Sequence, residues 1–175
     1  DFESALQTVR TWSADTDAAV ESSVKAIIAD VRQRGDAAVL DCTRRFDALD
    51  AASMEALTLT QDDLKEAFNA ITDAQREALQ QAAARIRDYH LRQRSASAQS
   101  WSYLDTQGNR LGQKVTPLDR VGVYVPGGKA AYPSSLLMNV VPARVAGVGE
   151  VVMVVPTPGG QRNNLVLAAA HLAGV

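Results

Sequence analysis

Apolar residues in the first part of the chain recur every three or four positions, which is the spacing of one face of an α-helix. Asp17 can cap such a segment, and Gly35 follows a basic last turn, where a glycine commonly ends a helix. The apolar positions between them are Val20, Val24, Ile27, Ile28 and Val31. We therefore predict a helix from Asp17 to just before Gly35. A second, shorter helix, capped by Asp36, is expected to end near Phe46.

The next helical pattern is longer. Thr60 and Asp63 resemble a capping box, in which each side chain binds the backbone amide of the other residue. An apolar stripe follows at helical spacing, at Leu64, Phe68, Ile71, Leu79, Ala83 and Ile86. One continuous helix from Thr60 to about His90 is predicted, and the polar residues 94–97 are expected to form a connector.

Strand patterns replace the helical ones beyond residue 100. Two short runs, 101–104 and 110–115, flank a turn that contains Gly108. Apolar and aromatic residues on both sides of a glycine-containing turn predict a β-hairpin.

Two continuous apolar runs, 120–125 and 150–155, predict strands that are buried on both faces. Each run is followed by a helical stretch, at 134–146 and at 161–173. Strands that alternate with helices in this way are typical of a parallel sheet. Pro142 falls inside the first helical stretch, so we expect that helix to bend or restart there.

The predicted fold class is α/β, with a helical N-terminal segment, a β-hairpin and an incomplete Rossmann-like β-α-β-α parallel-sheet layer. As domains, residues 1–99 are expected to form a helical region, and residues 100–175 the hairpin with the start of the α/β domain. Sheets commonly have five or six strands. A layer that supplies two suggests a truncated piece of a longer protein.

Composition narrows the classes of function. Hydrophobic residues make up 46% of the chain and charged residues 22%, as in ordinary globular domains. A net charge of -2 argues against a nucleic-acid-binding surface. Cys42 is the single cysteine, so neither an internal disulfide nor a thiolate zinc cluster can form. No apolar run reaches the roughly 20 residues of a membrane span. We therefore expect neither nucleic acid nor a membrane as a partner.

The loop after the first apolar run is the strongest candidate for a ligand site. Parallel sheets bind ligands at the carboxyl ends of their strands, where Gly127 and Gly128 would let the backbone approach a ligand closely. Tyr124 lies beside that end and can support a planar group or offer its hydroxyl. Ser134 or Ser135 can cap the next helix and leave its amide groups directed at an anion.

An ordinary structural role explains the same residues. Pro-Gly-Gly is also a common turn, Tyr124 can be a core aromatic, and a capped helix needs no ligand. The loop matches neither the dinucleotide fingerprint nor the phosphate loop, because Lys129 is followed by Ala130. Taken alone, the residues leave both a ligand site and a plain turn open.

A longer set of motifs resembles histidinol dehydrogenases. These motifs are Arg120-Val-Gly-Val-Tyr-Val-Pro-Gly-Gly, Pro133-Ser-Ser-Leu-Leu-Met138, Val141-Pro-Ala143, Ala146-Gly147, and earlier Val31-Arg-Gln-Arg-Gly-Asp36 and Arg45-Phe-Asp47. The resemblance implies an NAD-dependent oxidoreductase of histidine biosynthesis. In that family L-histidinol becomes L-histidine through two successive hydride transfers to NAD, and a zinc ion holds the substrate. The resemblance also implies a cytoplasmic homodimer.

The resemblance also assigns cofactor contacts. It places NAD against Tyr124 and makes Pro126 and Phe46 apolar contacts of the same ligand. For Phe46, a core aromatic that closes the second helix is an equally good interpretation.

By the same resemblance, the zinc ligands, the catalytic Glu-His pair and the substrate-binding residues all lie downstream of this region. We therefore assign no catalytic and no metal-binding residue here, and we expect the 175-residue chain to be inactive alone. His90 and His171, the two histidines, lack partners at metal-ligand spacing and are expected to be structural or solvent-facing. The alternative function is a non-catalytic nucleotide- or phosphate-binding α/β module, or a dimerisation domain.

Overall fold

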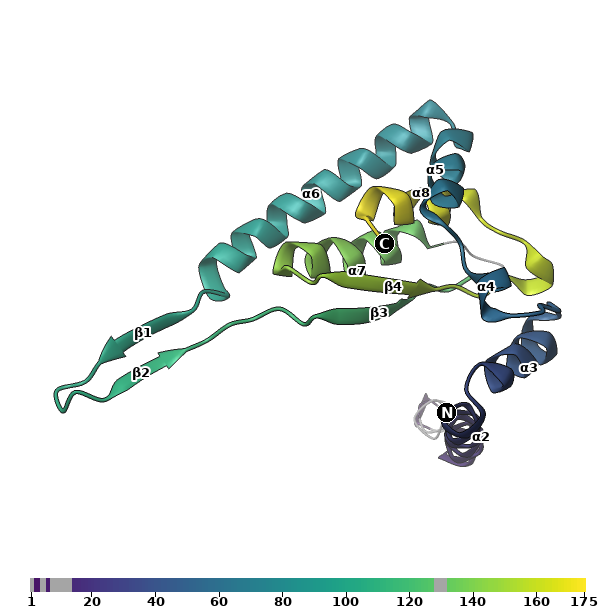
Figure 1. The fold of residues 1–175 in the computed structure, drawn as a ribbon, viewed down its shortest axis with the longest axis horizontal. Coiled ribbons are helices and arrows are strands. Elements are labelled where there is room, and N and C mark those ends of the chain that lie inside the picture. Colours follow the sequence, from purple (N-terminus) through teal and green to yellow (C-terminus); the bar gives the residue numbers. More distant parts are fainter. Residues whose placement is uncertain (1, 4–5, 7–13, 128–131) are drawn as a thin grey trace. The chain divides into compact units, whose positions relative to one another are not determined.

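The computed structural model of the chain describes residues 2–3, 6, 14–127 and 132–175 (Figure 1). The chain divides into two compact units, Asp1–Thr58 and Leu59–Val175.

The first unit is helical, with α2 over Ala14–Arg34, α3 over Asp36–Asp47 and a short α4 over Met54–Leu57. Helix α2 begins at Ala14, so the start predicted at Asp17 is wrong by about one turn. Gly35 does separate the first two helices, with a φ of 60° that favours glycine. The Gly35 N–H donates to the Val31 carbonyl at 2.8 Å, which closes α2.

The second unit begins with two helices where one was predicted. Helix α5 spans Gln61–Ala70 and helix α6 spans Asp73–Ser97. The predicted capping box of Thr60 and Asp63 is present, but Thr72 and Gln75 form a second one. Because a capping box fixes a helix start, the chain leaves the helical conformation at Ile71 and begins again. Helix α6 then continues through residues 94–97, which do not form the expected connector.

A parallel pair of strands forms the centre of the second unit. Strand β3, Arg120–Tyr124, pairs in register with strand β4, Glu150–Val154. Helix α7, Pro133–Ala146, connects them, and helix α8, Asn164–Ala173, follows a short 3-10 turn at Pro158–Gly160. The β-α-β-α order and the α/β class are thus confirmed.

The start of α8 lies three residues later than the sequence predicted. The side chain of Asn163 accepts hydrogen bonds from the backbone amides of Leu165 and Val166, at 3.0 and 3.2 Å. An asparagine in this position is a strong helix cap. The cap therefore sets the first helical residue at Asn164.

Helix α7 runs without interruption through Pro142, so it does not restart there, and the alternative expectation of a bend stays a prediction. A proline inside a helix lacks the N–H of one backbone hydrogen bond. Apolar side chains on both sides of it are buried, namely Leu136, Leu137, Val140, Val141 and Val145. Burial of these side chains holds the helix together across the missing bond.

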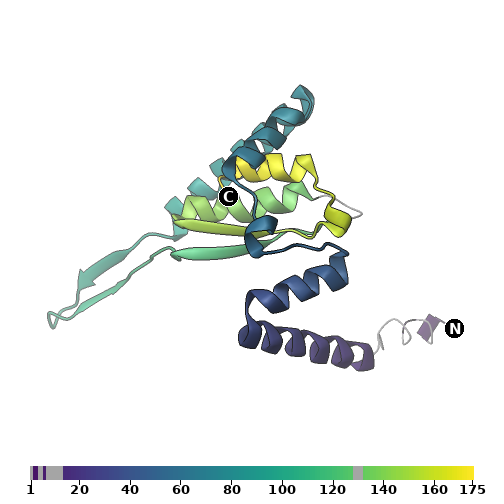
Figure 2. The same ribbon diagram turned by 45° about the vertical axis from the view of Figure 1, so that its right-hand side comes forward.

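The helices of the second unit cover one face of the strand pair. In Figures 1 and 2, α7 and α8 lie on one side of β3 and β4, with α6 beyond them. Helix α5 packs on α8, and α6 packs on α7. The core between these layers includes Val123, Val125, Val151, Leu167 and Ala169. Helices α5 and α6 thus pack with the sheet layer, while the predicted division at residues 99 and 100 stays a prediction.

The predicted hairpin is present, with strand β1 over Trp101–Leu104 paired to strand β2 over Arg110–Gln113. The Asp105 carboxylate accepts from the backbone amides of Gln107 and Asn109, both at 2.8 Å, and so shapes the turn. Every residue of both strands is exposed.

Candidate functional site

Tyr124 is the last residue of β3 and stands at its carboxyl end. Its neighbours Val123 and Val125 are buried against the helices, whereas 63% of Tyr124 is exposed. Because side chains alternate along a strand, the ring lies on the face that α7 and α8 do not cover. Its cross-strand partner there is Val154, which is 58% exposed. The structure therefore excludes the interpretation of Tyr124 as a core aromatic.

The loop after β3 lies against the loop after β4. The Val125 N–H donates to the Val154 carbonyl at 3.0 Å, which extends the strand pairing by one residue. Two residues later, a β-carbon on Gly127 would overlap the carbonyl oxygen of Pro156 and lie 3.1 Å from its carbonyl carbon. Glycine is thus required at 127 by a backbone-to-backbone approach.

Pro126 is half-buried and follows Tyr124 by two residues. Both residues therefore lie at the carboxyl end of β3. Gly128, the other predicted loop glycine, lies outside the described residues, as do positions 129–131. The sequence reasoning missed Pro156. Both apolar runs, 120–125 and 150–155, are followed directly by a proline, and this shared pattern could have pointed to Pro156.

The serine caps predicted for the helix after the loop are not present. Helix α7 begins at Pro133, with Tyr132 as the cap residue and no side-chain capping bond. Proline suits the first helical position, because its missing N–H would have no partner there. Ser134 and Ser135 therefore lie inside the first turn. Without a capping side chain, the first-turn amides can serve an anion at the strand end.

Phe46 belongs to the first unit, where it is the next-to-last residue of α3. It is 58% exposed, which excludes the interpretation as a core aromatic. The Arg45 guanidinium lies 4.9 Å from the centre of its ring. Tyr124 and Pro126 are thus brought together by one strand end, and Phe46 offers a ring on a separate unit.

The two histidines lie far apart in the sequence, on different helices. His90 on α6 has its Nδ1 2.8 Å from Gln93 Oε1, and its ring meets that of Tyr89 edge-on. His171 on α8 packs on Phe68 with ring centres 5.3 Å apart, and its buried Nδ1 has no hydrogen-bond partner. Within the described ranges, no three His, Cys, Asp or Glu residues lie close enough to hold a metal ion.

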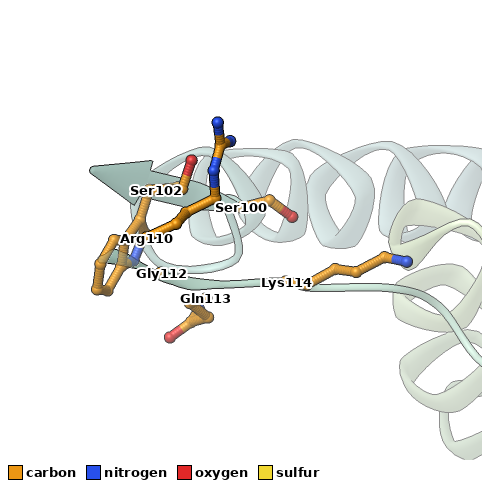
Figure 3. Close-up of a pocket in the computed structure, with 7 residues that line it drawn as sticks. Ser100, Ser102, Arg110, Gly112, Gln113 and Lys114 are labelled. Atoms are coloured by element: carbon orange, nitrogen blue, oxygen red, sulfur yellow. The ribbon is translucent and has the colours of Figure 1, made fainter. Parts of the chain in front are cut away.

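An open hollow of about 480 Å³ lies on the hairpin, away from the strand end (Figure 3). Its lining is polar and carries two cations, with Ser100, Trp101, Ser102, Arg110, Gly112, Gln113 and Lys114 around it. Gly112 is required for the strand pairing beside the hollow, because a β-carbon there would overlap the Trp101 carbonyl oxygen. No acidic residue of the described ranges lines the hollow.

The structure is that of an α/β protein with a parallel pair of strands. The loops that follow these two strands meet where Gly127 lies against Pro156. A model of the histidinol dehydrogenase family matches residues 10–175, and the chain belongs to this family. It is 58% identical to the histidinol dehydrogenase of Cupriavidus pinatubonensis, over 99% of this chain and 39% of that protein. It is 59% identical to that of Burkholderia lata, over 99% of this chain and 40% of that protein.

A solved structure agrees with the sequence relatives. The crystal structure of histidinol dehydrogenase from Elizabethkingia anophelis matches with a TM-score of 0.78 at 25% identity, covering 89% of this chain and 35% of that chain. The chain thus spans about two fifths of the length of the curated relatives it matches, and it corresponds to an N-terminal portion of such an enzyme.

Proposed function

We propose that this chain forms one wall of the NAD site of an NAD-dependent histidinol dehydrogenase. The complete enzyme would oxidise L-histidinol to L-histidine in two successive hydride transfers to NAD. The observation that carries the proposal is the exposed ring of Tyr124 at a strand end where Gly127 brings two backbone segments together. That is the place where parallel sheets bind dinucleotides.

The residues of the strand end fit a planar, phosphorylated ligand. The Tyr124 ring can stack on a flat ring system. Pro126 adds apolar surface beside it, and the uncapped first turn of α7 presents amide donors to a phosphate. When bound, NAD supplies the hydride acceptor. This chain's residues hold and orient the cofactor and exclude water from one side of it. Phe46 is proposed as a further apolar contact.

Zinc does not fit the described residues, which contain no group of three potential ligands. We therefore place the zinc of the complete enzyme, its catalytic groups and its L-histidinol contacts on residues outside this chain. A cytoplasmic homodimer is proposed on the same family grounds. Among the described helices, none is both long and apolar enough to cross a membrane.

The proposal is tested by titrating NAD, ADP-ribose and AMP into the full chain by calorimetry. We expect NAD to bind, and Tyr124→Ala to weaken binding by about two- to thirteenfold, since aromatic stacking contributes about 0.5–1.5 kcal/mol. Tyr89→Ala is the matched control, because Tyr89 is 65% exposed and lies on α6. Equal effects of both variants would contradict a role for Tyr124.

A second measurement tests whether the 175 residues supply only part of the NAD site or also the catalytic groups. We expect the 175-residue chain to show no reduction of NAD by L-histidinol, and the complete gene product to show it. Turnover by the 175 residues alone would show that the catalytic groups lie within them. Tight binding of AMP or inorganic phosphate without selectivity for NAD would instead favour a general phosphate-binding module.

A further inference from the structure

Arg45 and Phe46 form an exposed pair at the end of helix α3. The Arg45 guanidinium lies over the Phe46 ring, 4.9 Å from its centre, in the arrangement of a cation on an aromatic face. Phe46 is 58% exposed, and Arg45 is exposed as well. A phenyl ring does not neutralise the positive charge, so the N–H donors of the guanidinium stay available to an anion. The pair therefore offers a ligand both an apolar ring and a charged donor.

Arg45 keeps its charge unpaired although a carboxylate lies at a suitable spacing. Asp41 precedes Arg45 by four positions on α3, the spacing at which helical ion pairs commonly form. Asp41 instead binds Arg34 at 2.8 Å and Arg44 at 3.2 Å. Within the part of the chain that the structure describes, Arg45 takes part in no ion pair. Its guanidinium is therefore free to bind an anion.

The backbone that follows the pair is held by the neighbouring arginine. Ala48 ends α3 in the left-handed conformation, with a φ of 51°, which residues other than glycine adopt only where the surrounding contacts enforce it. Arg44 donates to the Asp50 carboxylate at 3.0 Å across this turn. Two adjacent arginines thus differ in role, because Arg44 is bound within the fold and Arg45 lies over the exposed ring.

Arg76 provides a contrast. It also lies over a ring, 5.4 Å from the centre of Phe68, but it donates to the Asp73 carboxylate and to three backbone carbonyls. Its charge is therefore used inside the fold. Phe68 is half-buried as well, whereas Phe46 is open to a ligand. Arg45 is the described arginine that combines an exposed ring with an unpaired charge.

We propose that Arg45 binds a phosphate group of the ligand whose ring contacts Phe46. The inference rests on the function proposed above, in which Phe46 contacts NAD, and it assigns the pyrophosphate of NAD to Arg45. A guanidinium binds phosphate through paired N–H donors, which adds charge and geometry to the apolar contact. In a dinucleotide each flat ring is joined through one ribose to the pyrophosphate. A ring on Phe46 therefore brings a phosphate toward the adjacent arginine.

A purely structural role for Arg45 makes a different prediction. Arg45 lies in the last turn of α3, where a cation complements the helix dipole. That role alone predicts a lower unfolding midpoint when Arg45 is replaced, and no change in cofactor binding. Measuring the unfolding midpoint and the KM for NAD of the same variants therefore separates the two roles.

Steady-state kinetics of the complete gene product test the assignment. We expect Arg45→Ala to raise the KM for NAD by about three- to fivefold with little change in kcat, as for the loss of a solvent-exposed ion pair of good geometry. Arg45→Lys keeps the charge and loses the paired donors, so its KM should lie between those of the unaltered enzyme and Arg45→Ala.

Arg32→Ala is the matched control. Arg32 is an exposed arginine in the last turn of α2, and it has neither an ion pair nor an aromatic ring beneath it among the described residues. Its replacement removes the same charge from the same unit. We expect the KM for NAD of Arg32→Ala to stay within about twofold of the unaltered enzyme.

The salt dependence of the KM distinguishes a charge contact from a change in the fold. Salt screens an arginine–phosphate contact, so the KM for NAD of the unaltered enzyme should rise between about 50 and 500 mM NaCl. Arg45→Ala should reduce this rise. Phe46→Ala should raise the KM and keep the rise, because it removes the ring and leaves the charge.

The outcomes that overturn the phosphate contact are distinct from those that overturn the proposed function. Equal salt dependence of Arg45→Ala and the unaltered enzyme, equal KM values for Arg45→Ala and Arg32→Ala, or a lower unfolding midpoint of Arg45→Ala with an unchanged KM would overturn the phosphate contact alone. An unchanged KM in Phe46→Ala would overturn it together with the Phe46 contact. A gene product that does not reduce NAD would overturn the proposed function and this inference with it.

Discussion

The backbone of Gly127 lies so close to the carbonyl group of Pro156 that no β-carbon fits between them. The two residues follow different strands, β3 and β4, and are 29 positions apart in the chain. Their contact fixes how the two strand-end loops meet. It also places Pro126 and Tyr124 at the edge of that junction.

Gly127→Ala should therefore destabilise the chain by about 1–3 kcal/mol, because an added β-carbon forces the two backbones apart. Denaturant unfolding of the full chain measures the loss. Gly122→Ala is the control, since a β-carbon on Gly122, which lies within β3, meets no atom within 4 Å. If NAD binds as proposed, Gly127→Ala should also weaken it. An alanine at 127 that is as stable as one at 122 would contradict the close approach.

Arg144 joins the ends of two helices. Its guanidinium donates to the Gly174 carbonyl at the end of α8, to Val148 O at 3.0 Å and to Gly149 O at 2.8 Å. Arg144→Ala leaves these acceptors without their charged donor, and we expect a loss of about 3 kcal/mol in the free energy of unfolding. Arg162→Ala, which removes a solvent-exposed ion pair with Asp63, should cost under about 1 kcal/mol. Equal losses would show that Arg144 acts only as a surface charge.

The start of helix α6 depends on the capping box that Thr72 forms with Gln75. The Thr72 hydroxyl accepts from the Gln75 N–H at 3.2 Å, and the Gln75 side chain accepts from the Thr72 N–H at 3.1 Å. Thr72→Ala should lower stability by about 1 kcal/mol, which is typical of a lost cap. Ser134→Ala, at a position predicted to cap and found not to, should leave the unfolding midpoint unchanged. A larger loss at Ser134 would mean that α7 is capped after all.

We expect the fold to lose stability at low pH in part because Asp63 becomes protonated. Hydrogen bonds from the Thr60 hydroxyl, at 2.6 Å, and from the Thr60 N–H, at 2.7 Å, lower the pKa of Asp63 below its ordinary 3.8. A carboxylate whose pKa is lower in the folded state stabilises the fold above its unfolded pKa. That stability is lost as the pH falls through the folded value.

Asp63→Asn should therefore reduce the slope of stability against pH below about pH 4. Unfolding midpoints measured between neutral pH and pH 2 test this. The slope should not vanish, since arginine partners also lower the pKa values of Asp30 and Asp41. If Asp63→Asn leaves the slope of stability against pH unchanged below about pH 4, the hydrogen bonds from Thr60 to Asp63 do not cause the loss of stability in acid.

The sequence by itself determined the local elements, because their signals lie within a few residues of one another. The Thr60–Asp63 cap, the stop at Gly35 and the β-α-β-α order were all predicted and are present. Even the break before Thr72 has a local signal, a threonine three residues ahead of a glutamine. The apolar stripe of the predicted long helix concealed it.

Tertiary structure alone decided which of these residues meet and which are left in water. The sequence allowed Tyr124 to be a core or a surface aromatic, and the packing of Val123 and Val125 on the helices turned it outward. The approach of Gly127 to Pro156, and the bond from Arg144 to Gly174, join residues about thirty positions apart. Such contacts depend on how strands and helices stack in space, and no short-range spacing of residue types encodes them.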